Sequence, residues 1–427
     1  MRGAWIAALL LAAPLAHVAK GAQAVQGSQT EQVPIGATVE VPLDHEHPEM
    51  GRAPLYYELG APYDPAKPLL LVIADGQQFY VRKGVMARLQ RDEFGDAFNV
   101  AGIVGRGATQ PFIDAALDAA GRPAWEKAWR VFRAEQWVED IDAVRRAIAG
   151  ADSKVLLYGV SGGALLVQQY LSRHGGQVAR AFIGAPVNPF LVGELRLSSD
   201  RFWEEIGPEL QKTLRAALDK HAGDRAAVIM TLQRQNFFVP PDRLPAARAE
   251  LIQALAAGDT GTYEKARKDY QVEEVKSFFD SNAGIPIRVR EYEFFQPSGA
   301  ASRLSDGGVN PDLENQRNFA APLLAVHEAG RIPAPVFDAA PFHRLDTELF
   351  ILAGRWDHAV DYRSTFALAA GFPRRHLFMA DDDHMLGRMK DDDSRQALLR
   401  AFFAFGLGSP QMTAALAAAE RHRWIED

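Results

Sequence analysis

One serine lies in a segment that is typical of a catalytic nucleophile. Residues 154–171 begin with the apolar run Lys-Val-Leu-Leu-Tyr, continue through Gly159-Val-Ser161-Gly-Gly163 and end in an amphipathic stretch. In such a G-x-S-x-G elbow, the serine occupies a strained turn between a strand and a helix, and its hydroxyl projects from the edge of the sheet. We therefore predict that Ser161 is the nucleophile of an acyl-transfer reaction. The alternative is a Gly/Ser turn without chemistry.

The glycines around Ser161 have separate predicted roles. Gly159 and Gly163 remove side chains that would clash across the turn. The backbone N–H of Gly162 opens the predicted helix, so it points toward an oxyanion that forms at Ser161, and the positive end of the helix adds to this effect. Gly162 is thus the predicted first donor of an oxyanion hole.

A serine hydroxyl needs an adjacent base, and the base needs an orienting acid. Asp357 follows the apolar run 348–353, and His384 follows the apolar run 376–379. One known class of triad has the chain order Ser, acid, His, with the last two members after late strands. We predict that His384 is the base and Asp357 the acid. His358 is the alternative base, and a loop residue that packs near the site is the expectation for it.

Eight short segments predict the strands that must position these residues, and the last six of them are continuous apolar runs. Unbroken runs of this length are typical of strands covered on both faces, and helical patterns such as Glu135–Ala149 alternate with them. The sequence therefore predicts an α/β fold with a mostly parallel central sheet flanked by helices. The predicted strand segments are Thr38–Pro42, Pro54–Leu59, Pro68–Ala74, Asn99–Gly105, Lys154–Tyr158, Ala181–Ile183, Glu348–Ala353 and His376–Met379.

The alternation stops between residues 188 and 345, which we call the cap segment. Helices are predicted at Arg201–Lys220, Pro245–Ala257 and Thr262–Phe279, and the Gly/Ser/Asp-rich stretch Gln296–Asn310 predicts a surface loop. The predicted organisation is a signal peptide (1–24), a first core part (25–187), a mostly helical insertion (188–345) and a second core part (346–427).

The first 24 residues are typical of an export signal. Arg2 precedes an apolar stretch of 13 residues, and Ala22-Gln-Ala24 fits a cleavage site. We expect a periplasmic or secreted protein with no stable membrane partner after cleavage; an uncleaved anchor is the alternative. The chain has no Cys and a net charge of −7, so disulfides are excluded and nucleic acid is not an expected partner. No feature predicts an oligomeric state.

Neither a metal nor another cofactor is expected. Asp381, Asp382 and Asp383 are adjacent carboxylates that cannot all face one ion, and no spaced ligand pattern accompanies them. A solvated acidic loop is the prediction for this segment.

These motifs together resemble the α/β-hydrolase superfamily, and within it the proline iminopeptidase and tripeptidyl aminopeptidase group of serine peptidases. The similar segments are Val41–Pro48, Trp137–Arg145, Tyr158–Gly163 and Gly354–Val360. The resemblance implies an α/β-hydrolase fold with a helical cap and a peptidase that removes residues from peptide N-termini. A carboxylesterase or lipase with the same triad remains an alternative, because the triad does not separate peptide from ester substrates. A binding protein that keeps the fold without catalysis is a further alternative.

The chain departs from this group at two loops. The group often has a His-Gly-Gly-Pro-Gly loop that supplies the second oxyanion donor, but this chain has Ala74-Asp-Gly76-Gln77-Gln78. The resemblance therefore implies Gly76 or Gln77 as the second donor. An Asp-Gln-Arg-Gly segment of the group is kept only in part, as Val104-Gly-Arg106-Gly107 without the acid, with Arg106 as a candidate at the pocket floor.

Peptidases of this group hold the substrate's ammonium group with cap carboxylates. The resemblance implies Glu291 and Glu293 as candidates, although their alternation with apolar residues also fits an ordinary exposed strand.

Overall fold

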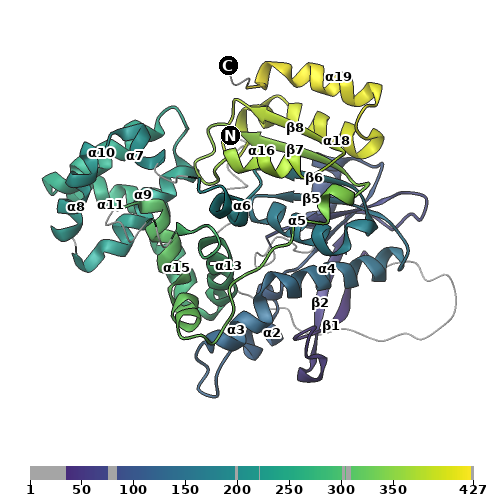
Figure 1. The fold of residues 1–427 in the computed structure, drawn as a ribbon, viewed down its shortest axis with the longest axis horizontal. Helices are drawn as coiled ribbons and strands as arrows, with labels where there is room; N and C mark the ends of the chain where they lie inside the picture. Colours follow the sequence, from purple (N-terminus) through teal and green to yellow (C-terminus); the bar gives the residue numbers. More distant parts are fainter. Residues whose placement is uncertain are drawn as a thin grey trace.

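One eight-stranded sheet forms the centre of the molecule (Figure 1). The computed structural model describes residues 35–75, 84–197, 201–220, 222–300, 303 and 309–424. The predicted signal peptide lies outside these ranges. Within them, the strands are β1 (Gly36–Pro42), β2 (Arg52–Leu59), β3 (Leu69–Ile73), β4 (Asn99–Ile103), β5 (Val155–Val160), β6 (Val178–Gly184), β7 (Glu348–Gly354) and β8 (Arg375–Ala380).

The strand order is β1-β2-β4-β3-β5-β6-β7-β8. The six strands from β3 to β8 run parallel, whereas β2 pairs antiparallel with both β1 and β4. All eight predicted strands are present, with ends shifted by a few residues. Because the parallel strands share one direction, the chain leaves β5, β7 and β8 at the same edge of the sheet.

Alternate residues of the central strands face two separate apolar layers. Leu71, Leu157 and Ile183 pack beneath α4 (Ala134–Ala149) and α5 (Gly162–His174), and Leu70, Leu156 and Phe182 pack against α18 (Ser394–Phe405). This two-sided burial is the reason that the strands read as unbroken apolar runs. The helices outside the cap segment are α1 (Val85–Leu89), α2 (Gln110–Ala115), α3 (Trp125–Phe132), α4 (Ala134–Ala149), α5 (Gly162–His174), α16 (Arg363–Ala370), α17 (Gly387–Asp391), α18 (Ser394–Phe405) and α19 (Pro410–Ala419). The arrangement confirms the predicted α/β-hydrolase fold.

Helices make up the regular structure of the cap segment in its described part. They are α6 (Pro189–Glu194), α7 (Arg201–Ile206), α8 (Glu209–Lys220), α9 (Arg225–Phe238), α10 (Leu244–Ala257), α11 (Thr260–Asp269), α12 (Val272–Asp280), α13 (Ile285–Phe295) and α15 (Pro311–Glu328). Figure 1 shows α7 to α11 as a lobe beside the sheet. In contrast, α13 and α15 add Val289, Tyr292 and Leu323 to the same apolar core as β3 and β5.

Several predictions for the cap segment were wrong in detail. The predicted helix 201–220 is two helices, because Gly207 takes a φ of 94° before Pro208. The predicted helix 262–279 divides into α11 and α12 around Gln271, whose φ is 55°. The stretch 289–295 is helical, so the exposed-strand alternative is wrong.

The predicted surface loop 296–310 is also wrong where the structure describes it. Ser298, Ala300, Val309 and Asn310 are all buried, and Asn310 accepts hydrogen bonds from the first turn of α15. In the ranges given above, every helix is too short or too polar to cross a membrane.

Candidate active site

Ser161 occupies the turn between β5 and α5. Its backbone angles are φ 56° and ψ −124°, a region that residues with a side chain rarely adopt and that costs about 1–3 kcal/mol. Hydrogen bonds hold the turn: Ser161 N donates to Gly184 O at 2.9 Å, and Ala164 N donates to Ser161 O at 2.9 Å. The first bond joins the elbow to the end of β6, so the strained conformation is fixed by the sheet.

Glycine is required on both sides of Ser161 because the chain approaches itself closely there. A Cβ atom on Gly159 would lie 2.6 Å from the carbonyl oxygen of Gly163. A Cβ atom on Gly163 would collide with the carbonyl oxygen of Ile73, and one on Gly162 would collide with Asp75 Oδ2. The end of β3 is therefore packed directly against the start of α5.

His384 and Asp357 lie in contact at the edge of the sheet where β7 and β8 end. His384 Nδ1 is 2.8 Å from Asp357 Oδ2. The other carboxylate oxygen accepts from the backbone N–H groups of Ala359 at 2.9 Å and Val360 at 2.8 Å. Both side chains are buried, so the carboxylate is held in one orientation and the imidazole is directed by it.

The surroundings of His384 favour a charged imidazole. Burial lowers its pKa, but the charge and hydrogen bond of Asp357, with the charge of Asp383, outweigh this effect and raise the pKa above its usual value. The ring of Phe237 from α9 meets the His384 ring edge-on, with centroids 6.0 Å apart. In the described chain, His384 has no hydrogen bond to Ser161 Oγ; such bonds often tighten only when substrate is bound.

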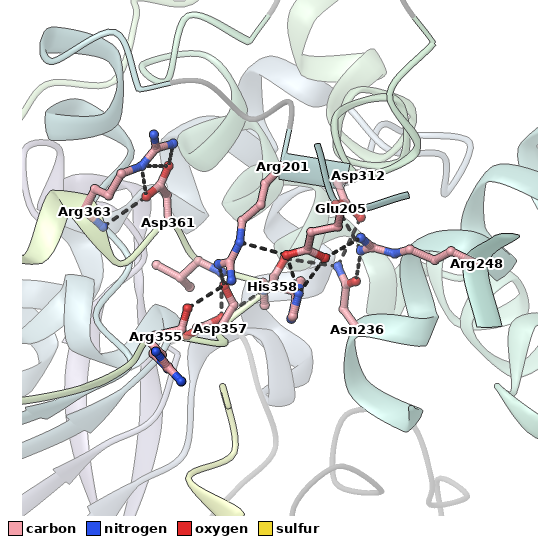
Figure 2. A network of polar contacts seen from close by, with 12 residues as sticks. Arg201, Glu205, Asn236, Arg248, Asp312, Arg355, Asp357, His358, Asp361 and Arg363 are labelled. Atoms are coloured by element: carbon pink, nitrogen blue, oxygen red, sulfur yellow. Dashed lines mark hydrogen bonds and ion pairs between the residues drawn. The ribbon is translucent and has the colours of Figure 1, made fainter. Parts of the chain in front are cut away.

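His358 is paired with a cap carboxylate and not with Asp357. Its Nε2 atom lies 2.9 Å from both carboxylate oxygens of Glu205, which belongs to α7 (Figure 2). Although burial raises the pKa of Glu205, its contacts with His358, Arg201 and Arg248 lower it below the usual value, so the carboxylate stays charged. This pairing agrees with the expectation of a loop residue that packs beside the site.

The acid loop is fastened to the cap segment by Arg201. Figure 2 shows its side chain reaching from α7 to the backbone of the loop after β7. Its Nη1 atom donates to Asp357 O at 2.7 Å, and its Nη2 atom donates to Arg355 O at 2.9 Å. The sequence analysis did not identify Arg201, because nothing in its local pattern indicates a partner about 150 residues away.

The predicted oxyanion donors are only partly described. Gly162 is the first residue of α5, so its N–H has no partner within the helix. Gly76 and Gln77 lie outside the described residues. The residue before them, Asp75, is described, and its carboxylate lies against Gly162 and accepts from Arg290 Nε at 2.9 Å.

The two candidate glutamates of α13 have different surroundings. Glu293 is buried: Oε1 accepts from Ala134 N at 2.6 Å, and Oε2 accepts from Arg290 Nη1 at 2.8 Å. Both of its oxygens are therefore engaged inside the protein, which argues against a role as ammonium ligand. Glu291 is half-buried and has no hydrogen-bond partner within the described ranges. Burial and the negative charge of Asp75 raise its pKa to about 8.

Arg106 is a structural residue in this fold. It is buried, and each of its five N–H groups has an acceptor: both oxygens of Asp140 and the carbonyl oxygens of Pro42, Leu43 and Val131. Its guanidinium also lies 4.6 Å from the ring centre of Phe112. No N–H group is left for a substrate, so its assignment to the pocket floor is wrong.

The three aspartates after β8 have different hydrogen-bond partners. Asp381 binds Arg355 and Trp356, Asp383 accepts from Met385 N, and Asp382 accepts from the N–H groups of Arg388 and Met389. Asp382 is 2% exposed, so the prediction of a wholly solvated loop is wrong. Within the described ranges, no group of three or more His, Asp or Glu residues is placed to hold a metal ion.

No protein-family model matches the chain, and no curated protein matches it. It is similar to the solved structure of a bromoperoxidase from Bacillus anthracis, with 15% identity over 85% of this chain and 98% of that one, and a TM-score of 0.40. The structure of an esterase from Rhodococcus sp. ECU1013 is similar with 15% identity over 86% and 99% of the two chains, and a TM-score of 0.42. An acetylester hydrolase from Corynebacterium glutamicum has 15% identity over 83% and 90%, and a TM-score of 0.37.

Proposed function

We propose that the protein is a serine hydrolase that acts by acyl transfer. The observation that carries this proposal is the 2.8 Å contact between His384 and Asp357 at the edge of the sheet where Ser161 occupies a strained elbow. In this mechanism Ser161 attacks a carbonyl carbon, His384 accepts the hydroxyl proton, and Gly162 N–H stabilises the oxyanion. His384 then gives the proton to the leaving group. In the second half of the reaction, His384 takes a proton from a water molecule that attacks the acyl group, and returns it to the Ser161 oxygen when the acyl group leaves.

We further propose that the substrates are peptides with a free amino terminus. The support is Glu291, a carboxyl group without an internal hydrogen-bond partner in the described chain, close enough to Asp75 for the charge of Asp75 to raise its pKa. A substrate ammonium group at this position would make Glu291 ionise and pair with it. The export of the chain to the periplasm or medium is a separate proposal, which rests on the sequence of residues 1–24.

A fluorophosphonate probe tests the nucleophile. We expect it to label the folded protein once, on Ser161, and to leave Ser161→Ala unlabelled. Absence of labelling on well-folded wild-type protein, or equal labelling of the variant, would contradict the proposal and favour a binding protein with this fold.

A comparison of substrates tests the specificity. We expect turnover of aminoacyl anilides with a free amino group, and little turnover when that group is acetylated. A protein that hydrolyses only esters, and treats free and acetylated amino groups alike, would be a carboxylesterase instead.

A further inference from the structure

Arg290 of α13 connects the two loops that border Ser161. Its Nη2 atom donates to the carbonyl oxygen of Gly162 at 3.0 Å, and its Nε atom donates to Asp75 Oδ1 at 2.9 Å. Gly162 belongs to the elbow, and Asp75 immediately precedes the predicted second oxyanion donors. One cap side chain thus binds both the elbow and Asp75.

The position of Arg290 is itself fixed on every side. It is 2% exposed, its Nη1 atom donates to Glu293 Oε2 at 2.8 Å, and its guanidinium lies 4.6 Å from the ring centre of Phe294. Glu293 in turn accepts from the backbone N–H of Ala134 at the start of α4. Val289 and Tyr292 hold the same helix in the main apolar core. The guanidinium therefore has little freedom to move relative to the sheet.

The charge of Arg290 is as important as its hydrogen bonds. Burial lowers its pKa, but the carboxylates of Asp75 and Glu293 outweigh this effect and raise it, so the guanidinium stays charged. The carboxylate of Asp75 lies beside Gly162, closely enough to exclude a Cβ atom there, and Arg290 places a positive charge against it. A negative charge at that place opposes an oxyanion that forms nearby, and in a buried site the effect is large.

We propose that Arg290 is a positioning residue of the oxyanion hole. It orients the peptide unit after Gly162, holds Asp75 against the start of α5 and places a positive charge against the Asp75 carboxylate. This inference rests on the proposed serine hydrolase activity. It goes beyond that activity because it assigns to a cap helix, which carries no member of the predicted triad, a direct effect on the rate of the chemical step.

Two kinetic quantities separate this role from a merely structural one. The loss of an interaction that is made only in the transition state lowers kcat and leaves KM nearly unchanged. A boronic acid inhibitor, which forms a tetrahedral adduct with the serine, should lose affinity by the same factor as kcat, whereas a product that binds reversibly should not. A loss of folded protein would lower the amount of active enzyme and change neither affinity.

The first variant is Arg290→Lys, which keeps the charge but cannot make the forked contacts. With the full-length protein and an activated ester, we expect kcat to fall about 10- to 100-fold at a KM within about twofold, with matching loss of boronate affinity. Arg288→Lys on the same helix is the matched control, since its guanidinium binds the carbonyl oxygens of Phe279, Asn318 and Phe319 and the Asp280 carboxylate, none of which belongs to the proposed site; its kcat should be unchanged. An unchanged kcat in Arg290→Lys would overturn the proposal.

A second pair of variants tests the charge. Arg290→Gln removes the Arg290 charge that lies against Asp75, and Arg290→Gln with Asp75→Asn removes both charges. We expect the double variant to have at least a tenfold higher kcat than the single one; if it does not, neutralisation of Asp75 is wrong. Wild-type protein that fails to react with the boronate and the ester would overturn the hydrolase proposal and this inference together, whereas active wild-type with unaffected variants overturns this inference alone.

Discussion

The carboxylate of Asp357 lies 2.8 Å from Nδ1 of His384, although the two residues are 27 positions apart and follow different strands. Their contact exists because β7 and β8 are parallel neighbours that end together, with Gly354 paired with Ala380. Asp357 is the third residue after β7 and His384 is the fourth residue after β8, so two short segments are sufficient to bring the side chains together.

Replacement of Asp357 by Asn should preserve the fold and remove most of the activity. The amide cannot stabilise a charged imidazole and favours the wrong tautomer of His384, so kcat should fall about 10⁴-fold. Steady-state kinetics together with circular dichroism measure this outcome. Asp361→Asn is the control in the same loop, because Asp361 pairs with Arg363 away from His384; comparable losses in both variants would contradict the assignment.

The pH dependence of kcat/KM should have an acid limb above pH 6.5. His384 must be neutral to accept the Ser161 proton, and the net effect of its surroundings raises its pKa, so activity is lost as the pH falls through that raised value. An ester substrate without ionisable groups isolates this titration from that of the substrate. A limb below pH 6.5 would show that His384 is not the titrating base or that Asp357 does not support it.

Glu291→Gln should weaken the binding of substrates with a free amino group. Loss of a charge-assisted hydrogen bond corresponds to an increase in KM of about 10- to 100-fold, while N-acetylated substrates should be unaffected. Because the pKa of Glu291 is about 8 in the free protein, binding of an ammonium group near pH 7 should also release a proton. Calorimetry in two buffers measures that release.

The exposed Glu274 of α12 provides the matched control for that experiment. Glu274→Gln should leave KM unchanged for both kinds of substrate. If Glu291→Gln also changes nothing, the preference for free amino termini loses its support.

Gly163→Ala should lower both stability and activity. The added methyl group meets the Ile73 carbonyl oxygen, which belongs to β3 and cannot turn away, so we expect a loss of about 1–3 kcal/mol in the free energy of unfolding. Gly176→Ala is the control, because nothing lies within 4 Å of its added methyl group. Urea denaturation compares the two; equal stability would show that the elbow is less tightly packed than the structure indicates.

Arg106→Met should destabilise the protein without a change in substrate affinity. It leaves the buried Asp140 carboxylate without its main counter-charge, which costs about 3–5 kcal/mol. Denaturant unfolding measures the loss, and KM of the folded fraction should stay as in wild-type. Arg122→Met, which removes a pair at the surface, should cost little. A raised KM in Arg106→Met would restore the substrate role that the structure argues against.

The sequence by itself determined the sheet and the expected places of Ser161, Asp357 and His384. These features depend on short-range patterns: each buried parallel strand is an apolar run, and the elbow needs its glycines within four residues of one another. The cap segment was predicted less well, since helix ends such as Gly207 and Gln271 depend on single backbone angles.

Only the tertiary structure decided the partners of the charged residues. Arg106, Glu293 and Arg290 looked alike as polar residues in mixed segments, yet they are buried, with partners up to 215 residues away in sequence. A buried charge must find its counter-charge in space, and no local pattern records where that partner lies. The same physical reason separates Glu291 from Glu293: the two lie two positions apart in sequence, but within the described residues only Glu293 forms hydrogen bonds with Arg290 and with the start of α4.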